Sequence, residues 1–356
     1  MERLILTTGG TGGHIFPALA VAEEVRKRFP SAHLLFVGSQ YGPEARLAQQ
    51  AGVDFVGLPV RGLLGRGLKA IAAAGRMGVA VAKAVRLVRS FAPQAVAGFG
   101  GYASFAPMLA GYLCGVPLVL HEQNAIAGVS NRCMGKLTRR VCLSLPDTKG
   151  FSAAKCVLTG NPVRQAVVAL AAQPRVFGRK HLLVVGGSQG ARALTDTVLQ
   201  ALPRLKSADV ELLLQTGPKD EARAREACIK AGYAEDTARA FIDDMAGAYT
   251  WADVALCRSG ASTVAELAVA GVPAMLVPFP YATHDHQTEN ARVLAGNGAA
   301  LLMAEKDMQT QDAMGQILAL LDDTQRLQTM SRCAQAQGKA RAAEAVADAI
   351  DAVIGK

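Results

Sequence analysis

The sequence has few charged and few aromatic residues, and its cysteines form no recognisable pairing pattern. Charged residues make up 19% of the 356 residues and aromatic residues 5%, whereas 51% are hydrophobic, which excludes a disordered chain. The seven cysteines are an odd number and none has C-x-x-C or zinc-ribbon spacing, so a reducing compartment is expected rather than a disulfide scaffold. A chain of this length is expected to bury two cores of ordinary domain size.

Two targeting features are also missing. The first residues run directly into the apolar stretch 4–6, without the basic start and cleavage site of a signal peptide, so a cytoplasmic location is expected. Residues 90–120 carry no charge and are long enough to cross a bilayer. However, prolines and glycines divide them into lengths that suit strands and short helices, which favours a buried α/β core over a transmembrane span.

Acidic residues are scarce in the first half of the chain. Residues 1–163 hold 18 Lys/Arg and 7 Asp/Glu, a net charge of +11, whereas residues 164–356 have a net charge of −2. No acid lies between Asp54 and Glu122, and basic residues alternate with apolar ones over 61–89. This segment predicts a surface for an anionic membrane or a nucleic acid, and a solvated helix face is the alternative. The scarcity of aromatic residues and the absence of a nucleic-acid-binding motif disfavour nucleic acid.

Strand-like and helix-like segments alternate along the chain, and the opening pattern returns near the middle. An apolar run over 3–8 leads into the glycine-rich 9–13 and then into helical spacing, and 181–185 leads in the same way into 186–191. Further strands are expected at 33–38, 53–57, 94–98, 117–121, 140–144, 210–215, 239–242, 253–257, 273–277 and 299–303.

This alternation predicts an α/β protein with two doubly wound, Rossmann-like domains. The first domain is expected over residues 1–163 and the second over 164–338. Residues 339–356 are expected to form a C-terminal helix that packs back on the first domain. Ligands of such sheets bind at the carboxyl ends of the strands.

The glycine segments at 9–13, 98–102 and 186–191 are candidates for a phosphate site. Glycines after a strand let backbone amides approach a ligand, and the following helix adds unpaired N–H groups and a positive dipole end, which suits a diphosphate. Tight strand-to-helix turns without a ligand are the alternative. No P-loop motif is present, and neither G-x-G-x-x-G nor the acidic residue that holds an NAD ribose is found, so a dehydrogenase is disfavoured.

Six motifs follow one another along the chain. They are Gly9-Gly10-Thr11-Gly12-Gly13-His14, Gly98-Phe99-Gly100-Gly101-Tyr102, His121-Glu122-Gln123-Asn124, Gly160-Asn161-Pro162-Val163-Arg164, Gly186-Gly187-Ser188-Gln189-Gly190-Ala191 and Cys257-Arg258-Ser259-Gly260-Ala261. In this order they resemble a family of GT-B glycosyltransferases, which transfer N-acetylglucosamine from UDP-N-acetylglucosamine to a lipid-linked muramoyl pentapeptide in bacterial peptidoglycan synthesis.

The resemblance implies an inverting transferase that needs no cofactor. The sugar moves to the C4 hydroxyl of undecaprenyl-diphospho-N-acetylmuramoyl-pentapeptide, which converts lipid I into lipid II at the cytoplasmic face of the bacterial inner membrane. The donor is expected on the C-terminal domain. The acceptor is expected on the N-terminal domain, which would rest on anionic lipid as a peripheral membrane protein. A UDP-N-acetylglucosamine 2-epimerase shares the fold and the donor but does not need the basic 61–89 segment.

The same resemblance assigns substrate-binding residues. Glu266 would accept hydrogen bonds from the ribose hydroxyls, and the backbone at Ile242 would bind uracil. Ser188 and Arg258 would meet the diphosphate, beside the glycine turn and helix start that hold Ala261, Ser262, Thr263, Val264 and Ala265. The residues expected around the sugar are Thr11, Gly12, Gly13, Asn124, Arg164 and Gln287.

The base that deprotonates the acceptor hydroxyl has two candidates. His14 lies at a helix N-terminus, where the dipole disfavours the protonated imidazole and so favours a neutral base. Glu122 is the second candidate, and a role for His14 in hydrogen bonding alone is the alternative. A metal site at His284 and His286 is disfavoured because no third ligand is evident.

Overall fold

The structure, a computed structural model, describes residues 1–10, 12–60, 69–187, 189–282 and 285–355, with backbone only for 69–74. The described chain forms two compact units. Unit 1 comprises residues 1–165 together with 339–356, and unit 2 comprises residues 166–338. Each unit is built on one parallel sheet, which confirms the predicted α/β class with two Rossmann-like folds.

Unit 1 contains a seven-stranded parallel sheet with the order β3-β2-β1-β4-β5-β6-β7. Its strands are β1 (Arg3–Thr7), β2 (His33–Ser39), β3 (Asp54–Leu58), β4 (Ala95–Gly98), β5 (Leu118–Glu122), β6 (Arg140–Leu143) and β7 (Cys156–Leu158). Its helices are α1 (Gly12–Arg28), α2 (Glu44–Gln50), α3 (Lys69–Phe91), α4 (Phe105–Leu113), α5 (Val129–Gly135) and α14 (Ala342–Ile354).

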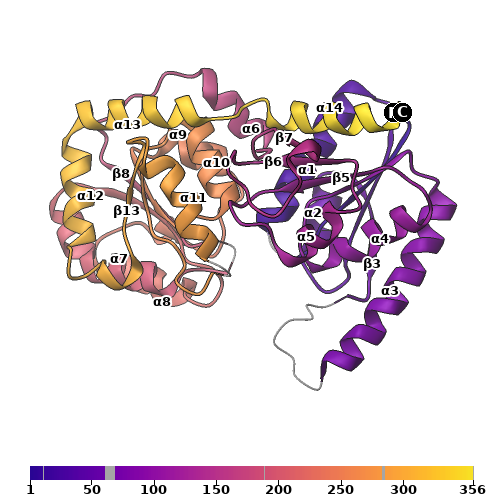
Figure 1. The fold of residues 1–356 in the computed structure, drawn as a ribbon. Helices are drawn as coiled ribbons and strands as arrows, with labels where there is room; N and C mark the ends of the chain where they lie inside the picture. Colours follow the sequence, from indigo (N-terminus) through magenta and orange to yellow (C-terminus); the bar gives the residue numbers. More distant parts are fainter. Residues whose placement is uncertain (11, 61–68, 188, 283–284, 356) are drawn as a thin grey trace. The chain divides into compact units, whose positions relative to one another are not determined.

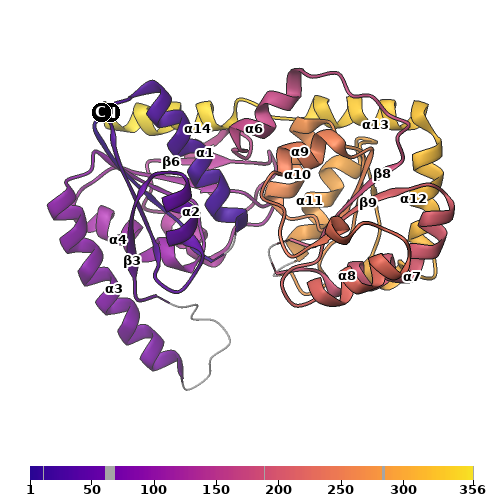
Figure 2. The same ribbon diagram turned by 180° about the vertical axis from the view of Figure 1, so that it is seen from behind.

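The two faces of this sheet are covered by different helices. Side chains alternate along β1, so Leu4 packs in a core with α1, whereas Ile5 packs in a second core with α3 and α4. The helix at the end of the chain, α14, contributes Val346 and Ile350 to the core on the α1 side, and the two helices lie side by side (Figures 1 and 2). Unit 1 therefore includes both ends of the chain.

Helix α3 is amphipathic. Ala80, Ala84 and Val88 recur every four residues and are buried against the sheet, whereas Arg76 and Lys83 are exposed beside this buried stripe. In Figures 1 and 2 the first turns of α3 extend away from the sheet of unit 1. The basic segment of the sequence is thus in part an exposed helix face.

Unit 2 contains a six-stranded parallel sheet with the order β10-β9-β8-β11-β12-β13. Its strands are β8 (His181–Val185), β9 (Glu211–Gln215), β10 (Ala238–Arg239), β11 (Val254–Cys257), β12 (Ala274–Leu276) and β13 (Ala300–Leu302). Its helices are α6 (Gln165–Val168), α7 (Arg192–Ser207), α8 (Glu221–Lys230), α9 (Met245–Trp251), α10 (Ala261–Ala270), α11 (His286–Ala295), α12 (Ala313–Asp322) and α13 (Thr324–Gln337), with the first residue of α6 in unit 1.

The strand predicted at 239–242 is the one that differs most from the structure. It ends at Arg239 as β10, because Asp244 caps the start of α9 by accepting a hydrogen bond from the amide of Gly247 at 2.8 Å. The edge strand β7 has no counterpart among the predicted strands. Val157 and Leu158 are exposed there, so the short segment lacks the pattern of a buried strand.

Candidate active site

In each sheet the strands are added first in one direction and then in the other, and the switch occurs between two neighbouring strands. Glycine segments follow these two strands. In unit 1 the neighbours β1 and β4 lead into the glycine segments 9–13 and 98–102, and in unit 2 the neighbours β8 and β11 lead into 186–190 and the turn at Gly260. Ligands of open α/β sheets bind outside the carboxyl ends of strands at such reversals. The topology therefore places one candidate ligand site on each unit.

The two glycine segments of unit 1 lie directly against each other. The amide of Gly9 donates to the carbonyl of Gly100 at 3.2 Å. A Cβ atom at Gly101 would lie 1.9 Å from the carbonyl oxygen of Gly9, and Gly101 has a φ of 78°, so only glycine fits there. The amide of Gly10 donates to the buried carboxylate of Glu44 at 3.1 Å, a contact that the sequence pattern does not indicate. Thr11 lies outside the described residues.

His14 is partly buried in the first turn of α1, immediately after Gly12 and Gly13. Its Nδ1 atom lies 3.0 Å from Oε1 of Gln123, which follows β5. Arg164 is held beside the same helix, with its guanidinium carbon 4.7 Å from the ring centre of Phe16. Unit 1 thus brings His14, Arg164 and the residues after β5 to one region around the start of α1.

Glu122 orders the loop that follows β5. Its side chain is 1% exposed, and each carboxylate oxygen lies within hydrogen-bond distance of two donors. Oε1 accepts from the backbone and side-chain nitrogens of Asn124 at 3.0 and 3.2 Å, and Oε2 accepts from the Gly128 amide at 3.3 Å and Asn131 Nδ2 at 2.8 Å. This geometry fits a residue that holds Asn124 in place, and it favours His14 over Glu122 as the base.

Glu266 is buried in unit 2 and has a partner that the sequence does not indicate. It lies in α10 with 4% of its surface exposed, and its Oε2 atom accepts a hydrogen bond from the Tyr249 hydroxyl at 3.0 Å. Tyr249 belongs to α9, which begins three residues after the buried Ile242. Two helices therefore cooperate to orient this carboxylate, and Tyr249 gives it one hydrogen bond independently of any ligand.

The start of α10 presents backbone donors. Its N-cap is Gly260, which supplies no side-chain hydrogen bond, and the first turn contains no acid. The amide of Val264 donates to the carbonyl of Gly260, and residues 261–263 precede it in the first turn, where amides have no acceptor within the helix. Ala265 lies one residue further into the helix, and Ser188 of the other glycine segment lies outside the described residues.

Arg258 and Gln287 both bind the segment 277–279 after β12. The Arg258 guanidinium pairs with Glu305 and donates to the carbonyls of Val277 and Pro278 at 3.3 and 3.2 Å. The side-chain oxygen of Gln287 accepts from the amide of Phe279 at 2.9 Å. Arg258 thus already has hydrogen-bond partners inside unit 2. A contact with a diphosphate, as predicted, would add to these bonds.

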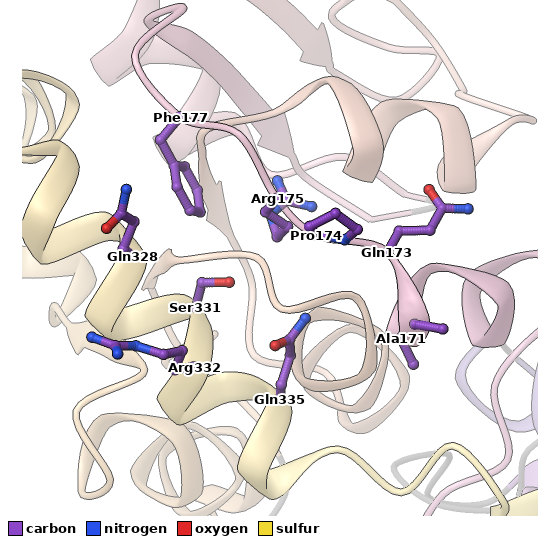
Figure 3. Close-up of a pocket in the computed structure, with 10 residues that line it drawn as sticks. Ala171, Gln173, Pro174, Arg175, Phe177, Gln328, Ser331, Arg332 and Gln335 are labelled. Carbon is purple, nitrogen blue, oxygen red and sulfur yellow. The ribbon is translucent and has the colours of Figure 1, made fainter.

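Arg175 connects α9 and α10 beside a surface cavity. It donates to the carbonyls of Tyr249 and Ala270 at 2.9 and 3.4 Å and to that of Ala252, and burial lowers its pKa to about 10. The neighbouring cavity of about 470 Å³ lies between segment 171–177 and α13 (Figure 3). Because none of the predicted site residues lines this cavity, we do not place the active site there.

His121 gives unit 1 a predictable acid sensitivity. Burial lowers its pKa from 6.5 to about 4. Since the unfolded chain takes up this proton first, the free energy of unfolding should fall by about 3 kcal/mol as the pH drops from about 6.5 to 4, and then level off. Urea titrations across this range should show a flatter pH dependence for His121→Gln. The exposed His33→Gln serves as the control, and equal slopes in all three proteins would contradict the prediction.

The described part of the chain contains neither a metal-binding cluster nor a membrane-spanning helix. In that part, no cluster of three His, Cys, Asp or Glu side chains has the geometry to hold a metal ion, and His284 lies outside it. Within the same residues, no helix is both long and apolar enough to cross a membrane.

A parallel sheet with glycine turns at its strand ends in each of two units is typical of the GT-B class of glycosyltransferases, and the comparisons agree. The N-terminal and C-terminal domain models of glycosyltransferase family 28 match residues 4–143 and 181–346. The chain belongs to glycosyltransferase family 28.

Individual relatives give the same result. A protein of Nitratidesulfovibrio vulgaris (strain Miyazaki F), named UDP-N-acetylglucosamine–N-acetylmuramyl-(pentapeptide) pyrophosphoryl-undecaprenol N-acetylglucosamine transferase, is 54% identical over 99% of this chain and 98% of its own length. The crystal structure of Acinetobacter baumannii MurG superposes with a TM-score of 0.76 at 32% identity, over 99% and 100% of the two chains. A solved UDP-N-acetylglucosamine 2-epimerase has a TM-score of 0.63 at 14% identity, over 97% and 94%, which shows a shared fold only.

Proposed function

We propose that this glycosyltransferase moves N-acetylglucosamine from UDP-N-acetylglucosamine to the C4 hydroxyl of undecaprenyl-diphospho-N-acetylmuramoyl-pentapeptide, with inversion. The observation that carries this proposal is the 54% identity, over 99% of the chain, to a relative that bears the name of this reaction. The conversion of lipid I into lipid II would make the protein a component of peptidoglycan synthesis.

The residues proposed to bind the nucleotide of the donor belong to unit 2. The carboxylate of Glu266 suits a vicinal diol such as ribose, because its two oxygens are both hydrogen-bond acceptors. The amides of residues 261–263 and the glycine segment around Ser188 would bind the diphosphate. Arg258 would meet the diphosphate and Gln287 the sugar, and both hydrogen-bond the segment 277–279. The backbone of Ile242 would bind uracil.

The proposed chemistry is a single displacement. The acceptor O4 attacks C1 of the sugar, the bond from C1 to the phosphate oxygen breaks, and the acceptor proton passes to His14. Negative charge develops on the departing UDP, where amides at a helix N-terminus stabilise it. Thr11, Gly12, Gly13, Asn124 and Arg164 are proposed to lie around the donor sugar, and no step in this scheme requires a cofactor.

The reaction itself is tested with the purified full-length protein. Incubation with labelled UDP-N-acetylglucosamine and a short-chain lipid I analogue should give a labelled disaccharide product, and UDP release should depend on the acceptor. A 2-epimerase would instead convert the UDP-sugar to its C2 epimer without an acceptor. Formation of that epimer, or UDP release without disaccharide, would overturn the proposed transfer.

We also propose that α3 attaches the protein to the anionic surface of the cytoplasmic membrane. Arg76, Lys83 and Arg86 are exposed on this helix, and the apolar Val79 beside them is 53% exposed. Cationic and apolar side chains on one exposed helix face are typical of membrane-surface binding. Two further basic residues of the 61–89 segment are not described in full: Arg66 lies outside the described residues, and so does the side chain of Lys69.

Neutralising Arg76, Lys83 and Arg86 to Gln should weaken binding to phosphatidylglycerol vesicles. The expected loss is about 1 kcal/mol per charge at low salt, while UDP affinity stays the same. The matched control neutralises Lys219, Lys306 and Arg326, which are exposed on unit 2. Equal vesicle binding by the two triple variants, or binding that is insensitive to salt, would refute the electrostatic attachment.

A further inference from the structure

A chain of hydrogen bonds runs from His14 into the interior of unit 1. His14 Nδ1 lies 3.0 Å from Gln123 Oε1, and Gln123 Nε2 lies 2.8 Å from the carbonyl of Phe99 and 3.1 Å from His121 Nδ1. The other ring nitrogen of His121, Nε2, lies 3.0 Å from the carbonyl of Gly160. Gln123 and His121 are each 1% exposed, so solvent does not compete for these bonds.

Two backbone carbonyls determine the direction of this chain. A carbonyl oxygen only accepts hydrogen bonds, so the side-chain group of Gln123 beside Phe99 is its NH₂, and its oxygen must face His14. For the same reason His121 Nε2 carries the hydrogen that Gly160 accepts. His121 Nδ1 then has a lone pair, which accepts the second hydrogen of the Gln123 NH₂.

The carbonyls of Phe99 and Gly160 therefore require the same orientation of the Gln123 amide. The Ser144 hydroxyl lies 3.4 Å from His121 Nε2, a longer contact that leaves this assignment unchanged because a hydroxyl also accepts. Burial keeps His121 neutral at physiological pH by lowering its pKa to about 4, so it continues to accept at Nδ1.

We propose that Gln123 is a positioning residue that holds His14 as the Nδ1–H tautomer, and that His121 holds Gln123 in turn. Since an amide oxygen cannot donate, the His14 nitrogen that faces Gln123 must carry the hydrogen. The lone pair then lies on Nε2, which is the nitrogen that would accept the proton of the acceptor hydroxyl. This inference rests on the proposed role of His14 as the base.

A glutamine suits this position better than a carboxylate does. A buried, ionised carboxylate costs free energy, and it has no hydrogens to donate to Phe99 and His121. The amide also leaves the imidazole neutral before the reaction and offers its oxygen dipole to the imidazolium that forms during it. The arrangement follows the logic of a catalytic triad, in which a third group fixes the tautomer of the base.

The tautomer can be measured in the wild-type protein. The full-length protein is labelled with ¹⁵N-histidine, and long-range ¹H–¹⁵N correlation spectra at pH 8 report which nitrogen of each ring is protonated. The sequence has six histidines, so spectra of His14→Gln and His121→Gln assign the two relevant signals. We expect Nδ1–H for His14 and Nε2–H for His121, whereas Nε2–H for His14 would overturn the inference.

Two substitutions of Gln123 test its effect on the reaction. Gln123→Met removes the acceptor and should lower kcat by about 10- to 100-fold, part of the contribution of base catalysis, with both KM values changed less than about threefold. The His14 tautomer should change in the same variant. Gln123→Glu restores an acceptor for His14, so it should keep the Nδ1–H tautomer and recover part of kcat.

The outcomes separate this inference from the proposed function. Normal kcat in Gln123→Met, or an equal loss in both variants with the wild-type tautomer retained, would show that Gln123 has only a structural role. If instead His14→Ala keeps full activity, the base assignment fails, although the wild-type tautomer still tests the positioning by Gln123. Because the wild-type spectrum needs no substitution of Gln123, the test stands even where a variant fails to fold.

Discussion

Replacement of His14 by Ala is expected to lower kcat by about 10²–10⁴-fold, the range that a general base contributes. His14 lies in the first turn of α1. The other candidate base, Glu122, already accepts hydrogen bonds from its own loop at both carboxylate oxygens. UDP affinity should stay nearly the same, because the residues proposed to bind the nucleotide belong to unit 2. Steady-state kinetics with both substrates varied, together with UDP calorimetry, measure the two effects.

The pH dependence of the rate identifies the role of His14. Protonation of the base lowers the rate on the acidic side, so the acidic limb of the pH–rate profile should disappear in His14→Ala. The exposed His33→Ala is the matched control and should keep both kcat and the limb. A near-normal kcat with the same acidic limb would transfer the role to Glu122 or to water. An increase in acceptor KM alone would make His14 a binding residue.

Replacement of Glu266 by Ala is expected to weaken UDP binding by about 1–3 kcal/mol, the cost of leaving buried polar groups without partners. The variant removes the proposed ribose acceptor and also leaves the buried hydroxyl of Tyr249 without the carboxylate to which it donates at 3.0 Å. Isothermal calorimetry with UDP measures the loss directly.

Comparison of UDP with 2′-deoxy-UDP separates a ribose contact from a general loss of structure. The wild-type protein should prefer UDP, and Glu266→Ala should lose most of this preference. Glu266→Gln keeps one acceptor oxygen and should lie between the two. Unchanged UDP affinity in Glu266→Ala would remove this residue from the donor site, and equal losses for both nucleotides would assign it a structural role.

The parallel sheets could be predicted from sequence because their strands are buried. Strands such as β1 and β8 are continuous apolar runs that end in glycine turns, and this pattern depends on local sequence alone. The bounds of β10 and the presence of β7 could not be predicted from an apolar run. A helix cap at Asp244 ends the first of these segments, and exposure of Val157 and Leu158 at a sheet edge hides the second.

The glycine turns and helix starts of the candidate site could be predicted from the sequence, but the hydrogen-bond partners of its side chains could not. Glycine turns and helix starts follow from sequence spacing, so residues such as Gly12 and Ser262 could be placed at strand ends. Hydrogen bonds between distant residues depend on tertiary structure. Tyr249 binds Glu266, Gln123 binds His14, and Arg258 binds Glu305, and no local pattern pairs residues that are 17, 109 and 47 positions apart.

The configuration of the new glycosidic bond tests the proposed reaction most directly. The sugar of UDP-N-acetylglucosamine is α-linked, so a single displacement assisted by one base must give a β-linked disaccharide. The product made by the purified protein from a short-chain lipid I analogue can be isolated, and the ¹H coupling constant at its C1 proton distinguishes the two configurations. We predict a β linkage to O4 of the muramoyl residue. An α linkage, or the absence of a disaccharide when both substrates are present, would contradict the account.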